Sequence, residues 1–137
     1  MNTTYVSSLI LLGSLAWAGC GQKQAGSQTA PQELPTISVQ ALSDRIAAGR
    51  ETFVLDVRTP GEYDGPLGHI AGSRLIPVQE LSRRMQELSE MKDHHIFVIC
   101  RSGNRSATAT RLLREGGFEA SNVAGGMQAW NSLARKY

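Results

Sequence analysis

The sequence has no large excess of charge of either sign. Fourteen Lys and Arg residues stand against 12 Asp and Glu residues, which gives a net charge of +2, whereas nucleic-acid-binding domains usually carry a much stronger basic excess. Charged residues make up 19% and hydrophobic residues 41% of the 137-residue chain, as is ordinary for one folded domain. Nucleic acid is therefore not an expected partner, and any preference for an anion must come from a local site.

The sequence also lacks an apolar run long enough to cross a membrane. The mainly apolar run from Val6 to Ala18 has 13 residues, and a transmembrane helix needs about 20. Its length, and the small residues before Cys20, are typical of a bacterial lipoprotein signal. We therefore expect a signal over 1–19 and lipid on Cys20, which would be the only membrane contact of an exported protein of the periplasm or cell envelope. A plain cleaved signal and a buried N-terminal helix are the alternatives.

Cysteine is scarce as well, because Cys20 and Cys100 are the only two. With lipid on Cys20, Cys100 is the single thiol of the mature chain and has no partner for a disulfide. Residues 20–35 are rich in Gln, Gly, Ser, Ala and Pro and are expected to form a flexible linker. A lone free thiol in an exported protein requires a chemical reason.

From residue 36 onward, the apolar pattern alternates between strand and helix. Strands are predicted at 53–57, 75–77, 96–100 and 118–123, and helices after Ser38 and over 79–91, 106–114 and 127–134. The segment 59–68 is predicted to be a loop with little regular structure. This order predicts an α/β fold with a mostly parallel sheet and helices on both faces. Ligands bind such sheets at the carboxyl ends of the strands.

Cys100 lies at one of these strand ends and is followed by a basic, glycine-containing loop. A cysteine attacks as the thiolate, whose formation requires a lowered pKa. The backbone N–H groups from Arg101 to Ser106, the start of the next helix and the charges of Arg101 and Arg105 would all favour the thiolate and bind an anion beside it. The alternative is a buried, inert cysteine followed by an ordinary polar turn.

Five motifs occur in an order that resembles the single-domain rhodaneses, or thiosulfate sulfurtransferases. They are Asp56-Val57-Arg58, Glu62-Tyr63 with Gly68–Ser73, Ile76-Pro77, the loop Cys100–Ser106, and Gly125–Trp130. The resemblance covers about 100 residues and implies a rhodanese-like domain over 36–137. It also implies a three-layer fold with a central five-stranded sheet.

The resemblance implies a persulfide mechanism that needs no metal or organic cofactor. Cys100 would take sulfane sulfur from thiosulfate or a similar anion and pass it to cyanide, a thiol or a protein acceptor. The residues expected to bind the donor are Arg101, Ser102, Gly103, Asn104, Arg105 and Ser106, with Arg58 at the mouth of the site. Arg58 is further expected to pair with a carboxylate such as Glu62 and to hold the loop.

Other polar residues are expected to be structural. Asp56 would form hydrogen bonds inside a buried strand, and His69 would support its loop. His94, His95 and Cys100 fall along one strand without a fourth ligand, so a metal site is not predicted.

Two other functions use similar residues. Phosphatases and arsenate reductases place an arginine six positions after the cysteine, where this sequence has Ser106. Arg105 comes one position earlier, and the shorter loop favours a sulfur atom over a tetrahedral oxyanion. A non-catalytic binding module is the second alternative, but such modules typically lack the cysteine.

Overall fold

A five-stranded parallel sheet forms the centre of the computed structural model, which describes residues 33–135. The strands lie in the order β1 (Thr36–Ser38), β5 (Ala120–Ala124), β4 (Ile96–Ile99), β2 (Phe53–Asp56) and β3 (Arg74–Leu75). All neighbouring pairs run parallel, which confirms the predicted α/β fold and its five strands. The predicted signal, Cys20 and the linker up to residue 32 lie outside the described residues.

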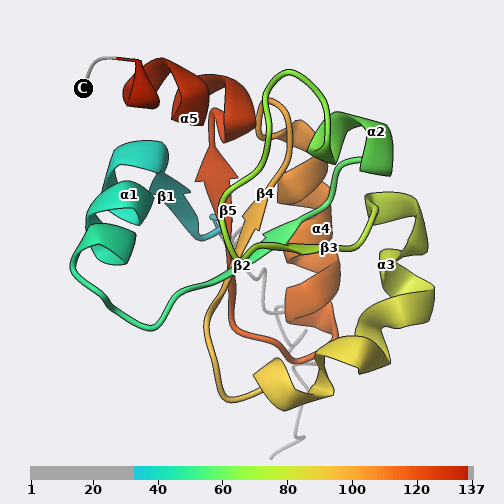
Figure 1. Ribbon diagram of the computed structural model, residues 1–137. Coiled ribbons are helices and arrows are strands. Elements are labelled where there is room, and N and C mark those ends of the chain that lie inside the picture. The colour runs from blue at the N-terminus through green and yellow to red at the C-terminus, as the bar shows by residue number, and fades with distance from the viewer. Residues whose placement is uncertain (1–32, 136–137) are drawn as a thin grey trace, which may run out of the picture. The chain divides into compact units, whose positions relative to one another are not determined.

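Helices cover both faces of this sheet (Figure 1). On one face lie α1 (Val39–Ala47) and α5 (Gly126–Ala134), and on the other lie α3 (Val78–Arg84), the 3₁₀ helix η1 (Met85–Met91) and α4 (Asn104–Glu115). The short helix α2 (Pro60–Tyr63) follows β2. Each face has its own apolar core, as the parallel arrangement requires. None of the helices within residues 33–135 is long and apolar enough to cross a membrane.

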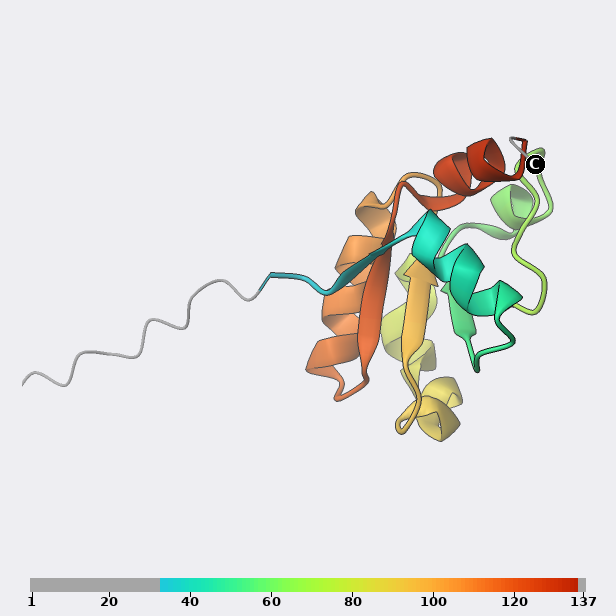
Figure 2. The ribbon, with the colours of Figure 1, turned by 90° about the vertical axis from the view of Figure 1, so that its left-hand side faces the viewer.

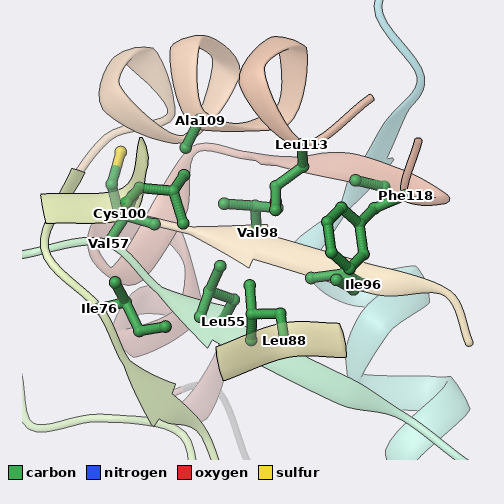
Figure 3. Packing of buried hydrophobic residues seen from close by; sticks show 12 residues of the cluster. Leu55, Val57, Ile76, Leu88, Ile96, Val98, Cys100, Ala109, Leu113 and Phe118 are labelled. Atoms are coloured by element: carbon green, nitrogen blue, oxygen red, sulfur yellow. The ribbon is translucent and has the colours of Figure 1, made fainter. Parts of the chain in front are cut away.

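The central strand β4 contributes to both cores because its side chains alternate. Ile96, Val98 and Cys100 belong to the core beneath α4, as Figure 3 shows, whereas Phe97 and Ile99 belong to the opposite core. Every residue of β4 is buried, which explains why its sequence is a continuous apolar run. The register of this strand therefore decides that the thiol points toward the start of α4.

Four elements differ from the sequence predictions. The strand β1 was not predicted, since three residues with partly exposed side chains are too few to show a pattern. The predicted loop 59–68 contains α2, whose capping box is formed by Thr59 and Glu62. The single helix predicted over 79–91 is divided, because 3₁₀ winding brings Met85, Leu88 and Met91 onto the same core face.

The fourth difference concerns the loop Cys100–Ser106. Helix α4 begins at Asn104 rather than Ser106, so Ser106 belongs to the first helical turn, where backbone N–H groups have no partner within the helix. The strands β4 and β5 run side by side to the same edge of the sheet, and α5 follows β5 directly at that edge (Figure 2). The residues after β4 therefore meet the starts of two helices.

Candidate active site

The thiol of Cys100 lies at the carboxyl edge of the sheet, one residue after β4. The side chain is only 1% exposed. Its Sγ accepts hydrogen bonds from the Gly103 N–H (3.1 Å) and the Ser106 hydroxyl (3.2 Å). Gly103 has a φ of +109°, a conformation that other residues rarely adopt and that lets the loop turn back on the sulfur. The loop thus forms a cradle of donors around Sγ, as the sequence predicted.

These donors lower the pKa of Cys100 even though the thiol is buried. Burial is the largest influence and by itself raises the pKa, because it disfavours the charged thiolate. Hydrogen bonds from the Ser106 hydroxyl and from the N–H groups of Ser106, Gly103 and Ser102 together outweigh burial, and the net pKa falls below its ordinary value. The site is therefore built to hold a sulfur anion.

Asn122 supports this cradle from β5 and was not predicted as a site residue. It is buried, and its Oδ1 lies 2.6 Å from the Ser106 Oγ. The single hydroxyl proton of Ser106 has three acceptors within reach, which are the Asn122 Oδ1, the Gly103 carbonyl (3.1 Å) and the Cys100 Sγ. The thiolate attracts this proton more strongly than the two neutral carbonyl oxygens do, since the thiolate is charged. An asparagine within a predicted buried strand was the available signal, because a buried amide needs a polar partner.

Replacement of Ser106 by alanine is expected to raise the pKa of Cys100, since one charge-assisted hydrogen bond to the thiolate is lost. The thiolate fraction at neutral pH falls as a result. The pH dependence of iodoacetamide alkylation, followed on the peptide that contains Cys100, measures this change. Ser102→Ala is the matched control, because it keeps the backbone N–H. Equal pKa values in the two variants would contradict the assignment.

The beginning of α5 holds the loop from the other side. The Met127 N–H donates to the Cys100 carbonyl (2.8 Å), and the Gln128 N–H donates to the Arg101 carbonyl (3.0 Å). Gly126 makes this approach possible, since its φ is +55° and a Cβ there would lie 2.4 Å from the Cys100 carbonyl oxygen. With its carbonyls fixed outward, the loop directs its N–H groups toward the sulfur. This contact explains the second glycine of the Gly125–Trp130 motif, whereas a Cβ on the first, Gly125 (φ of +79°), would lie 2.6 Å from the Ala129 Cβ.

Arg58 is buried and engaged by partners within the chain, which corrects the predicted pairing with the Glu62 carboxylate. Its Nε and Nη2 donate to both carboxylate oxygens of Asp56, and Nη2 lies 2.6 Å from Oδ2. The remaining contacts are to the carbonyls of Glu62 (2.9 Å) and Gly68 (2.7 Å). Asp56 is the partner because it ends the same buried strand two residues earlier. Arg58 thus holds the 59–68 segment, as expected, and Asp56 is structural.

The carboxylate of Glu62 pairs with Arg105 instead. The two side chains form a bidentate ion pair with N–O distances of 2.7 and 2.6 Å. The hydrogen bond from Arg105 is the main reason that the pKa of Glu62 is lowered to about 2, and hydrogen bonds from Thr59 add to it against the opposing effect of burial. Glu62 therefore stays ionised at any physiological pH. The charge of Arg105, which the sequence assigned to donor binding, is largely neutralised.

A pocket of about 410 Å³ opens beside the loop. Its lining residues are Arg58, Gly61, Glu62, Pro66, Leu67, Arg101 and Gln128. Among residues 33–135, Arg101 has no ion-pair partner, and it is exposed. Ser102 and Asn104 are exposed as well, and their predicted contacts with a donor stay predictions. Gln128, Pro66 and Leu67 were not singled out from the sequence, because only the fold brings them to the loop.

The histidines contact residues other than Cys100. The His69 ring stacks on Tyr63 with a centroid distance of 3.8 Å, and its Nδ1 lies 3.1 Å from the Tyr63 carbonyl, so it supports its loop as predicted. His94 and His95 precede β4, and Cys100 follows it, so these residues lie at opposite ends of the strand. No cluster of three or more metal-binding side chains is found in the part of the chain that the structure describes.

Known proteins are similar to this chain in sequence and in fold. Residues 38–133 match the rhodanese-like domain. YtwF of Bacillus subtilis, provisionally named a sulfurtransferase, is 38% identical over 98 residues, which are 72% of this chain and 91% of that protein. YrkF of the same organism, provisionally named a sulfur carrier protein, is 37% identical over 98 residues, or 71% of this chain and 51% of that protein. The chain therefore spans about half the length of YrkF.

A solved structure supports the same grouping. The crystal structure of a rhodanese-related protein from Thermoplasma volcanium has 37% sequence identity and a TM-score of 0.64. The similarity covers 72% of this chain and 92% of that one. The similarity therefore extends over almost the whole of that protein and over most of the present chain.

Proposed function

Because the chain belongs to the rhodanese-like domain family, we propose that it is a sulfurtransferase that carries sulfane sulfur as a persulfide on Cys100. Relatives named for sulfur transfer indicate this general chemistry. The position of the Cys100 Sγ carries the proposal, because its hydrogen bonds from Gly103 and Ser106 at the start of α4 stabilise a sulfur anion. The proposed donor is thiosulfate or a similar small anion.

The reaction has two displacement steps. In the first, the Cys100 thiolate attacks the outer sulfur of thiosulfate, an S–S bond to Cys100 forms, and the donor S–S bond breaks with release of sulfite. Cys100 then carries a persulfide anion in place of the thiolate. In the second step, cyanide or a thiolate attacks the terminal sulfur, and the thiolate of Cys100 leaves. A protein thiol is a further proposed acceptor. Neither step needs an external oxidant or reductant.

The orientation of Arg105 speaks against phosphate chemistry. Its guanidinium faces Glu62, and Ser106 occupies the position at which tyrosine-phosphatase-type loops have their arginine. A dianionic phosphate above Cys100 would lack the bidentate donor that stabilises its oxygens. A persulfide anion requires only the backbone and hydroxyl donors that Cys100 already has.

Intact mass provides the direct test. After incubation of the full chain with thiosulfate, we expect a gain of one sulfur atom (about 32 Da) on the peptide that contains Cys100. Cyanide should remove the added mass and release thiocyanate. A chain that gains no sulfur from thiosulfate, thiosulfonates or organic persulfides would refute sulfur transfer through this thiol.

We also propose that the protein is exported and attached to the cell envelope by lipid on Cys20. The support is the order of the apolar run, the small residues and the cysteine within residues 6–20. Mass spectrometry of protein from its native host should find an acylated Cys20 at the N-terminus. An intact, unmodified Met1 would refute it.

A further inference from the structure

Three arginines lie near the mouth of the Cys100 site: Arg58 and Arg101 line the pocket, and Arg105 is paired with the lining residue Glu62. Two of the three have their charge neutralised within the chain. Arg58 is 1% exposed and paired with the buried Asp56. Arg105 is held by both carboxylate oxygens of Glu62. Arg101 is left as the one mouth arginine without an ion-pair partner among residues 33–135. The site therefore offers an arriving anion about one unit of free positive charge.

The Glu62–Arg105 pair is rigidly placed. Glu62 belongs to the capping box of α2, in which its Oε2 accepts from the Thr59 N–H and hydroxyl (both 3.2 Å). Both side chains are about one-third exposed, and Glu62 lines the pocket. Glu62 thus cancels the attraction that Arg105 would otherwise exert on an anion entering the site, and this lost attraction is larger for a doubly charged anion than for a singly charged one.

The pocket has room and apolar surface that an inorganic anion would not use. Its volume of about 410 Å³ is within the range of sites for organic ligands. Pro66 and Leu67 form an apolar wall, and Arg101 and Gln128 supply polar groups. The wall is held in place, since the Asn131 amide donates to the Leu67 carbonyl (2.8 Å). A donor with an apolar body and one negative charge would fit both features.

We propose that Glu62 determines the donor specificity of this site. By neutralising Arg105, it favours singly charged organic sulfane-sulfur donors, such as thiosulfonates, over the doubly charged thiosulfate. This inference rests on the proposed persulfide chemistry of Cys100 and ranks the donors for it. Arg101 binds the single charge, and the organic group lies against Pro66 and Leu67.

The reaction of a thiosulfonate follows the same course. The Cys100 thiolate attacks the sulfane sulfur, the bond between this sulfur and the sulfonyl sulfur breaks, and a sulfinate leaves with the bonding electron pair. Cys100 then carries the persulfide anion. One negative charge leaves as sulfinate and one stays on the persulfide, which balances the charges of the thiolate and the thiosulfonate.

The test compares two donors that differ mainly in charge and in the organic group, with cyanide as the common acceptor. The ratio of kcat/KM for benzenethiosulfonate to that for thiosulfate is measured in the full chain. We expect a ratio above ten for the unaltered protein. In Glu62→Gln, the freed Arg105 should shift the ratio about tenfold toward thiosulfate. Glu90→Gln, an exposed residue of η1 with the same change in charge, should keep the original ratio.

A double variant separates charge from local structure. Glu62→Gln with Arg105→Gln removes both charges, so the ratio should return toward that of the unaltered protein. A preference of the unaltered protein for thiosulfate, or an equal effect of Glu62→Gln on both donors, would overturn the role of Glu62 while sulfur transfer itself stands. If neither donor places sulfur on Cys100, the proposed function fails, and the donor preference fails with it.

Discussion

Cys100→Ser is expected to abolish sulfur transfer. The rate with any sulfane-sulfur donor should fall roughly a thousandfold or more, because a serine hydroxyl is not ionised at neutral pH and is a poor nucleophile toward sulfur. The substitution replaces sulfur by a slightly smaller oxygen within the same donors, Gly103 and Ser106, so the fold should persist. Thiocyanate formation from cyanide and the added mass of one sulfur atom measure the loss.

Cys20→Ser is the matched control for this experiment. It removes the other cysteine of the chain, and the resulting protein, produced without lipid, should retain full transfer activity. A persulfide that persists in Cys100→Ser and disappears in Cys20→Ser would show that Cys20 carries the sulfur. This outcome would contradict the site described above. Thermal unfolding of both variants establishes that they are folded.

Gly126→Ala should have the second largest effect, a loss of roughly a hundredfold in kcat/KM, because misplacing a catalytic group by about 1 Å can cost this much. The alanine Cβ would lie 2.4 Å from the Cys100 carbonyl oxygen and 2.7 Å from the Arg101 carbonyl. The loop and α5 must therefore move apart, which breaks the hydrogen bonds from Met127 and Gln128. The pKa of Cys100 should rise in parallel, since the donors around Sγ lose their alignment.

Gly117→Ala is the control that separates the effect of the close contact at Gly126 from the effect of a positive φ. Gly117 also has a positive φ, +81°, but a Cβ there would meet nothing within 4 Å. The left-handed conformation costs about 1–2 kcal/mol for alanine in either variant, so Gly117→Ala should lose stability and keep its activity. If both variants kept the transfer rate and the pKa of Cys100, the contact between α5 and the loop would have no role in the chemistry.

Much of the site could be predicted because its signals are local. A continuous apolar run predicts a buried central strand, and the glycine three residues after Cys100 predicts a tight turn. The strand–loop–helix order places the thiol at the carboxyl edge of a parallel sheet. Even α2, which was predicted as loop, has a capping box that can be read from Thr59 and Glu62.

The partners of the charged residues could not be predicted in the same way. Glu62 and Arg105 are 43 positions apart, and Asn122 and Ser106 come from different elements of the fold. Spacing along the chain suggested Glu62 as the partner of Arg58. The partner is Asp56, because both side chains are buried together at the end of β2.

The sequence by itself determined the α/β class, the thiol at a strand end and the donor-rich loop around it, since periodicity and short spacings encode these features. Only the tertiary structure decided how much positive charge the site retains. Strand order brings α2 beside α4 and α5 against the loop, and these long-range contacts pair Arg105 with Glu62 and fix the carbonyls of Cys100 and Arg101. Ion pairs of this kind depend on distance in space, which local patterns along a chain do not specify.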